Sequence, residues 1–183
     1  LFSHGAVLYS VGRGMSGRLW YPQLDVYDAI RRIGGLLTFW SADTSPSPER
    51  LFIADFYLAN PPLLHKTHMA REVRKEFSEL GIMRPEKAFI SYPSPPILFQ
   101  KMDEVQRQAF RTLTGKGLID LPRLEKGTVS PSAAGFELFE DRFVPLFGET
   151  ERKVAEFIAG SFSLAEKEIG ALRRSTGLRR VVR

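Results

Sequence analysis

Apolar residues recur at intervals of three and four over most of this 183-residue chain, and this spacing is the strongest constraint on its fold. Such spacing places side chains on one face of an α-helix, whereas a half-buried strand alternates every second residue. The clearest stripe consists of Val26, Ile30, Ile33, Leu37 and Trp40. Further apolar runs predict five more helical segments, at 50–60, 69–80, 98–113, 132–146 and 150–172. We therefore expect a mainly α protein.

Residues that favour helix ends support two of these segments. Asp25 precedes the first stripe and is a plausible N-cap. Ser47 is a plausible N-cap for the second segment, because Pro48 follows at the first helical position. Gly34 and Gly35 weaken the first helix by about 1 kcal/mol each relative to alanine. They also leave room for a neighbouring helix to approach closely.

One segment departs from the helical period. Residues 118–121 and 128–129 are short apolar runs on either side of a turn near 125–127, which predicts a β-hairpin. A helix, a hairpin and a further helix in this order resemble a winged helix. The expected fold is thus a winged-helix-like helical domain with one short β-hairpin, the wing, and a C-terminal helical extension. Its predicted parts are an N-terminal strand or loop (1–24), the winged-helix-like domain (25–138), and C-terminal helices with a basic tail (139–183).

A winged helix offers a surface for DNA or for a protein partner. The helix before the hairpin can enter the major groove, while the wing reaches the phosphate backbone. Asp103 and Glu104 on that helix oppose a uniformly positive face, and many winged helices bind proteins instead. Candidate contact residues are Arg107, Gln108, Arg111 and Lys116 on the helix, with Arg123 and Lys126 on the wing.

The positive charge of the chain is concentrated at its end. The net charge is +5, and Arg173, Arg174, Arg179, Arg180 and Arg183 account for all of it. The first 172 residues are therefore neutral, with 21 basic and 21 acidic side chains. The basic tail either contacts phosphate or an acidic partner, or it is a solvated end.

Motifs for catalysis or cofactor binding are weak. The chain has no cysteine, which excludes disulfides and thiolate ligands. Gly12, Gly14 and Gly17 have the spacing of a dinucleotide loop, but the sequence that follows predicts no βαβ unit. His65 and His68 are three residues apart and lack a convincing third metal ligand. We expect no enzyme activity, no cofactor and no metal.

The sequence also gives an expectation about location. It contains no run of about 18 uncharged apolar residues, which a membrane-spanning helix would need. It shows no export signal either. We therefore expect a cytoplasmic protein without a membrane contact.

Two runs carry a family resemblance. Residues 27–37 (YDAIRRIGGLL) and 47–61 (SPERLFIADFYLANP) resemble the small middle components of bacterial ABC-three-component conflict systems, over about residues 25–138. Lamassu-type antiphage systems are similar in organisation. The resemblance implies an accessory subunit that joins an SMC- or ABC-like ATPase to an effector, often a nuclease. It supplies no catalytic residues.

An adaptor of this kind needs exposed apolar anchors. Candidates outside the helical stripes are Trp20, Tyr21, Phe89 and Tyr92, although these could also cover the core. The function we expect is a non-catalytic adaptor subunit of an antiphage defence complex that links the ATPase to the effector, with DNA as a further candidate partner that it binds weakly on its own. The alternative is a stand-alone winged-helix DNA-binding transcription regulator.

Overall fold

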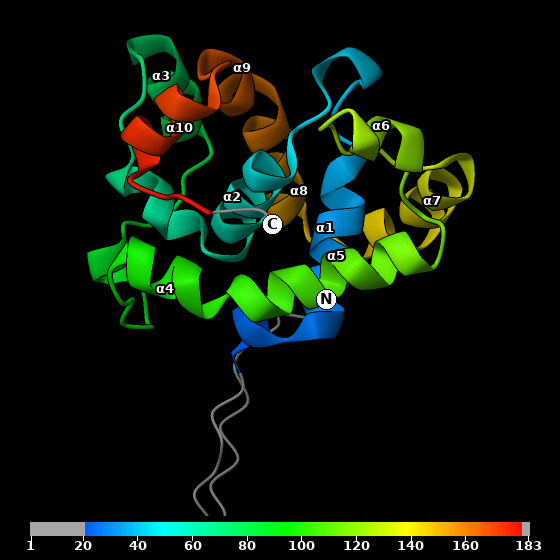
Figure 1. Ribbon diagram of the computed structural model, residues 1–183. Coiled ribbons are helices and arrows are strands. Elements are labelled where there is room, and N and C mark those ends of the chain that lie inside the picture. The colour runs from blue at the N-terminus through cyan, green and yellow to red at the C-terminus, as the bar shows by residue number, and fades with distance from the viewer. Residues whose placement is uncertain (1–20, 181–183) are drawn as a thin grey trace, which may run out of the picture.

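The computed structural model describes residues 21–180, and this part of the chain is built from helices joined by short connections (Figure 1). The α-helices are α1 (Val26–Leu37), α2 (Pro48–Ala59), α3 (Arg71–Glu79), α4 (Pro95–Lys101), α5 (Asp103–Gly115), α6 (Leu121–Glu125), α7 (Ala133–Leu138), α8 (Glu149–Phe157), α9 (Ser163–Ala165) and α10 (Ile169–Thr176). The 3₁₀ turns are η1 (Pro22–Leu24), η2 (Ala42–Thr44), η3 (Pro61–Lys66), η4 (Pro85–Lys87) and η6 (Val144–Leu146). Two π-helical turns, η5 (Phe139–Phe143) and η7 (Ile158–Phe162), continue α7 and α8. The predicted mainly α class is confirmed. None of the helices within residues 21–180 is long and apolar enough to cross a membrane.

Local capping sets the first two helix starts as predicted. The side chain of Asp25 accepts a hydrogen bond from the backbone N–H of Asp28 at 3.0 Å, at the start of α1. The hydroxyl of Ser47 accepts from the N–H of Arg50 at 3.3 Å, at the start of α2. Both bonds satisfy N–H groups that the first helical turn leaves without a partner.

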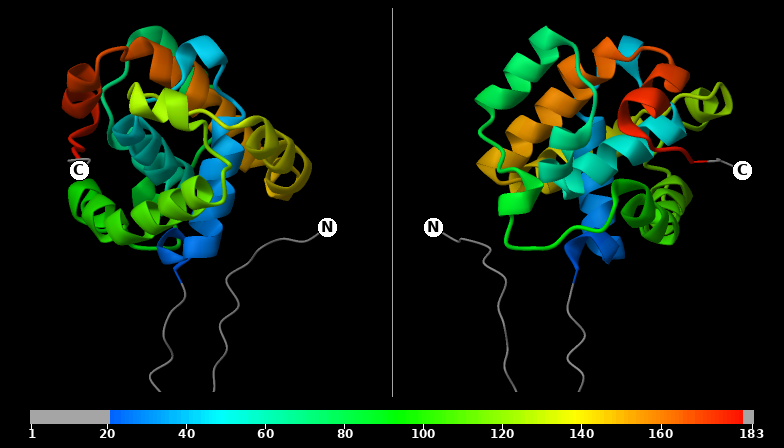
Figure 2. Two further views of the ribbon diagram at one scale, coloured as in Figure 1. Left: turned by 45° about the vertical axis from the view of Figure 1, so that its right-hand side comes forward. Right: turned by 90° about the vertical axis from the view of Figure 1, so that its left-hand side faces the viewer.

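The core is organised around α2. Ten of its twelve residues are buried, because apolar side chains surround the helix on nearly all sides. Helix α5 packs across α1, and α8 with η7 covers α2 (Figure 2). A single hydrophobic cluster runs from Ala29 to Leu178, so the C-terminal helices share this core with α1–α5. The division of the chain at residues 138 and 139 stays a prediction.

The paired glycines of α1 allow close packing, as expected. A Cβ atom at Gly34 would lie 2.6 Å from Cδ2 of Phe143, and one at Gly35 would lie 2.6 Å from Cζ of Phe147. These distances are shorter than real Cβ contacts. The two aromatic rings therefore occupy the space that larger side chains would need.

The predicted wing is wrong. Between residues 118 and 132, the structure has one isolated antiparallel bridge, Ile119–Pro131, and no hairpin. Helix α6 occupies the intervening segment, because the Asp120 side chain caps it by accepting from the N–H of Arg123 at 3.1 Å. Pro122 at the start of α6 also favours a helix. A locally capped helix therefore forms here in place of two paired strands.

The predicted helix at 98–113 is also different, because it is divided in two. Helices α4 and α5 meet at Met102, which is fully buried. The two helices lie end to end along one side of the molecule (Figure 1).

Candidate functional site

The outer face of α5 carries the predicted contact residues. Gln106, Ala109 and Leu113 are the buried residues of this helix. The predicted contact residues on α5 lie elsewhere: Gln108 and Arg111 are exposed, and Arg107 is partly exposed. The helical period thus placed these three residues on the accessible side. Lys116 is also exposed and lies just after the end of α5.

Carboxylates of the same helix neutralise two of those cations. The Nε of Arg107 donates to Asp103 at 2.8 Å, and Nη2 of Arg111 donates to Glu104 at 3.2 Å. Exposed ion pairs contribute about 0–1 kcal/mol, so they are easily exchanged for other partners. In the structure, these two acidic and two basic side chains balance, so the outer face of α5 is not strongly positive.

The two predicted wing residues lie on and after α6 instead. Arg123 is partly buried, and its Nη1 donates to the carbonyl of Ala42 at 2.9 Å. This bond ties α6 to η2, which follows α1. Lys126 is exposed just beyond the end of α6. Without a wing, neither side chain lies at the tip of a hairpin.

A groove of about 530 Å³ lies between η2, α6 and the start of α7. Two buried polar atoms in residues of its lining, Nε1 of Trp40 and Oγ of Ser130, have no hydrogen-bond partner within residues 21–180. Leaving a buried donor or acceptor unpaired costs about 1–3 kcal/mol. The lining is mixed in character: Leu37, Trp40, Ala42, Ser45, Asp120, Arg123, Val129, Ser130, Pro131, Ser132, Ala133 and Phe136.

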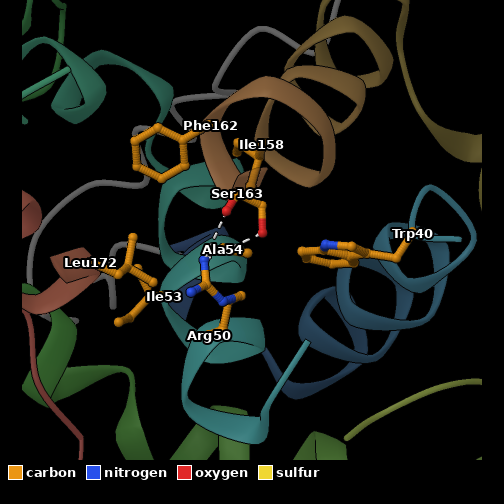
Figure 3. Close-up of a pocket in the computed structure, with 8 residues that line it drawn as sticks. All are labelled: Trp40, Arg50, Ile53, Ala54, Ile158, Phe162, Ser163 and Leu172. Atoms are coloured by element: carbon orange, nitrogen blue, oxygen red, sulfur yellow. Dashed lines mark hydrogen bonds between the residues drawn. The ribbon is translucent and has the colours of Figure 1, made fainter. Parts of the chain in front are cut away.

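Trp40 also borders a second, much smaller cavity (Figure 3). Arg50 from α2 crosses this space and donates to the carbonyl and hydroxyl oxygens of Ser163, at 3.1 and 3.4 Å. Its guanidinium also bonds the carbonyl of Lys167 at 2.8 Å. The cavity measures about 10 Å³, which is at most room for one water molecule. Arg50 therefore has a structural role, because it satisfies carbonyls at the start of α9 and after its end.

The predicted apolar anchors differ in exposure. Phe89 is fully exposed at 102%, Tyr21 is 41% exposed, and Tyr92 is partly buried against the core. Trp20 lies outside the described residues. Ile90 belongs to the same candidate loop as Phe89 and is 48% exposed. Sequence reasoning missed two further exposed apolar residues close to this loop in the chain, Met83 and Ile97.

The arginine-rich end is only partly solvated. Arg174 and Arg179 are exposed, and Arg173 forms an ion pair with the buried Glu49, with 2.5 Å between Nη2 and Oε2. Arg180 is only 5% exposed. The alternative that Arg180 is part of a solvated end is therefore wrong, because its side chain lies inside the molecule, while its role as a contact residue stays a prediction.

Arg180 occupies a pocket of acceptors and aromatic rings. Its guanidinium donates to the side-chain oxygen of Gln106 and to the carbonyl of Phe99, and its Nε lies 3.1 Å from Asp103. It stacks 3.8 Å above the Phe99 ring, in a cation–π contact. Burial lowers the pKa of Arg180 to about 10, although Asp103 opposes that shift.

Behind this pocket lies a second buried ion pair, which sequence reasoning missed. Gln106 donates to Asp55 at 2.9 Å, and Arg32 donates to both oxygens of Asp55, at 2.7 and 3.2 Å. All three residues are 1% exposed or less. Asp55 within the apolar helix α2 and Arg32 next to an apolar stripe are the signals that could have indicated the pair.

Of the candidate metal and cofactor motifs, the structure describes the two histidines but not the glycine motif. Nε2 of His65 lies 2.7 Å from the carbonyl of Ile82, while His68 is exposed. Among the residues that the structure describes, no group of three potential ligands could hold a metal ion. The glycine motif at 12–17 lies outside the described residues.

These features define a small helical protein with exposed apolar side chains, an ion-paired helix face and an open groove. The chain belongs to the family described as ABC-three component (ABC-3C) system Middle Component 5, which it matches over residues 18–178. The resemblance found in the sequence is thereby confirmed. No curated protein and no solved structure matches the chain.

Proposed function

We propose that this middle component is an adaptor subunit that links the ATPase of its system to the effector. Membership of a three-component system implies that the other components are its partners. The proposal further assigns it a non-catalytic role. Its support is the chemistry of the described surface, which offers apolar anchors for protein contacts.

The observation that carries the proposal is the exposure of Phe89. A fully exposed phenylalanine gains most when it enters an apolar pocket of a partner, because aromatic anchors supply much of the binding energy in interfaces. Ile90, adjacent in the chain, is 48% exposed, and Met83 and Ile97 on either side are 56% and 53% exposed. The segment from η4 to α4 therefore has the residues that a docking element needs.

The charges near this segment indicate the kind of partner surface. Arg84, Lys87 and Lys101 are exposed, and Glu86 is the acidic residue among them. A partner pocket with an acidic rim would complement this excess of positive charge. Such rim charges speed association and fix orientation more than they add affinity.

The experiment is co-purification with the other two components. The tagged chain is co-expressed with the ATPase and the effector of its own system, and the captured amounts are compared for wild type and Phe89→Asp. We expect Phe89→Asp to reduce capture at least about tenfold, the size of effect an interface hot spot produces. The matched control is Leu164→Asp, because Leu164 is also a large exposed apolar residue (50%) but lies on α9.

Two results would contradict the proposal. Capture of the Phe89→Asp variant at the wild-type level would show that this segment is not the anchor. Tight binding of the isolated chain to DNA, with a steep salt dependence, would instead favour the transcription regulator. Both variants should keep the wild-type melting temperature, because their side chains are exposed.

A further inference from the structure

The chain changes direction sharply after α10. Gly177 has a φ of 72°, in the left-handed region that glycine adopts at low cost, and it ends the helix there. Beyond it, buried and exposed side chains alternate: Leu178 is buried, Arg179 is exposed and Arg180 is buried. This alternation is how an extended peptide lies in a groove.

The site that receives this segment recognises arginine specifically. Glu49 on α2 accepts the backbone N–H of Arg180 at 2.9 Å. The guanidinium meets the Gln106 side chain, the Phe99 carbonyl and Asp103, and stacks on the Phe99 ring. Planar stacking combined with several directed acceptors suits a guanidinium better than an ammonium group.

The pocket is held in place by residues other than the segment itself. Gln106 also donates to the Phe52 carbonyl and to Asp55, each at 2.9 Å, and Asp55 is fixed by Arg32. These bonds do not involve Arg180, so we expect them to keep Gln106 oriented when Arg180 leaves. Such preorganisation of an acceptor lowers the cost of binding.

Seating the segment has a cost as well as bonds, because the guanidinium of Arg180 loses its water. The lowered pKa of Arg180 indicates that loss of water from its charge outweighs the attraction of Asp103 and Glu49, and Arg107 repels it further. Helix α10 has its own attachments, the Arg173–Glu49 ion pair and a bond from the N–H of His68 to the carbonyl of Ser175 at 2.9 Å. Release of residues 178–180 would leave α10 in place.

We propose that this pocket is an exchangeable binding site for an extended Leu-x-Arg segment, and that a second copy of the chain can supply residues 178–180 in trans. The second copy is the fitting occupant, because its segment is chemically the same as the one already seated. The short connection at Gly177 lets the segment leave without unfolding a helix. Exchange of an identical element between two copies of a chain is a low-cost route to dimers.

The test mixes two variants that are complementary. Arg180→Ala leaves the pocket without its arginine, while Asp103→Lys places a cation at the pocket mouth and repels the arginine of its own chain. Asp103 is a suitable position, because its side chain is 38% exposed. We expect each variant alone to be monomeric in sedimentation and native mass spectrometry, and the mixture to contain a dimer of one copy of each. A control mixture of Arg180→Ala with the double variant Asp103→Lys/Arg180→Ala should form no dimer.

A mixture that stays monomeric would overturn the proposal. A dimer in the control mixture would do the same, since no Arg180 is present there.

Hydrogen exchange on the wild-type chain provides a check that needs no variant. We expect the amide of Arg180 to exchange on the order of 10-fold or more faster than buried amides of α2, through local opening. Equal protection would show that the segment is a permanent part of the fold. The proposal is independent of the adaptor role.

Discussion

Gly135 is the position where a single methyl group should damage this fold most directly. It lies in the first turn of α7, and a Cβ there would be 2.0 Å from the carbonyl oxygen of Leu118 and 2.8 Å from its carbonyl carbon. Both are backbone atoms, which cannot rotate away as a side chain can. Restoring an acceptable contact requires a backbone shift of about 1 Å, since real Cβ atoms essentially never come within 3.0 Å. The same carbonyl accepts the N–H of Ser132 at 3.0 Å, so that bond would be strained as well.

The size of the effect follows from three contributions. Overpacking costs about 1–3 kcal/mol, and a weakened hydrogen bond adds about 1 kcal/mol. Alanine is favoured over glycine in a helix by about 0.5–1 kcal/mol, which offsets part of this cost. We expect Gly135→Ala to lower the free energy of unfolding by about 2 kcal/mol. For a domain of this size, that lowers Tm by about 4–8 °C.

The assay is thermal unfolding followed by circular dichroism or calorimetry, with Gly115→Ala as the matched control. Gly115 is the last residue of α5, and a Cβ there meets no atom within 4 Å. The control should therefore gain about 0.5–1 kcal/mol from helix propensity, and its Tm should rise by about 1–4 °C. The reasoning is refuted if both substitutions shift Tm in the same direction.

Three further results are expected. Asp55→Ala should lower the free energy of unfolding by about 3–5 kcal/mol, because it leaves the buried guanidinium of Arg32 without this partner. Urea titration measures the free energy of unfolding, and a loss below about 1 kcal/mol would contradict the prediction. Although burial alone raises the pKa of Glu49, hydrogen bonds from Arg173 and from the backbone of Arg180 hold it below its ordinary value. The stability of the protein should therefore fall as the pH drops through that lowered pKa. Glu49→Gln should flatten the acid side of a plot of Tm against pH, and an unchanged slope would show that ionised Glu49 does not contribute to stability. Gly34→Ala should lower the free energy of unfolding by about 1–3 kcal/mol. The cost is smaller than that of an equal clash with backbone atoms, because the Phe143 ring can partly move. A raised Tm in calorimetry would disprove the close contact.

Much of the helical architecture was predictable, because it depends on contacts within four residues. The stripe from Val26 to Trp40 and the caps Asp25 and Ser47 act within one or two turns of their helices. The outward position of Arg111 on α5 followed from the same period. The wing is absent for a local reason that the sequence contains. Asp120 followed by Pro122 is a helix start, and it outcompeted a weak pairing signal.

The candidate sites were harder to predict. Phe89 is a predicted anchor because it falls outside the helical stripes, yet nothing in the sequence distinguishes its full exposure from the partial burial of Tyr92. The groove at Trp40 depends on how η2, α6 and α7 meet, which no local pattern specifies.

The amino-acid sequence by itself determined the helical class, the starts of α1 and α2 and the family, because capping bonds and apolar periodicity are encoded in neighbouring residues. Only the tertiary structure decided which buried charges meet. Arg32 and Asp55 are 23 residues apart, and Arg180 and Gln106 are 74 apart. A buried charge is tolerated only opposite a partner, and that partner is set by which helix faces pack together. For that physical reason, an arginine that looked like part of a solvated tail proved to be the occupant of an interior pocket.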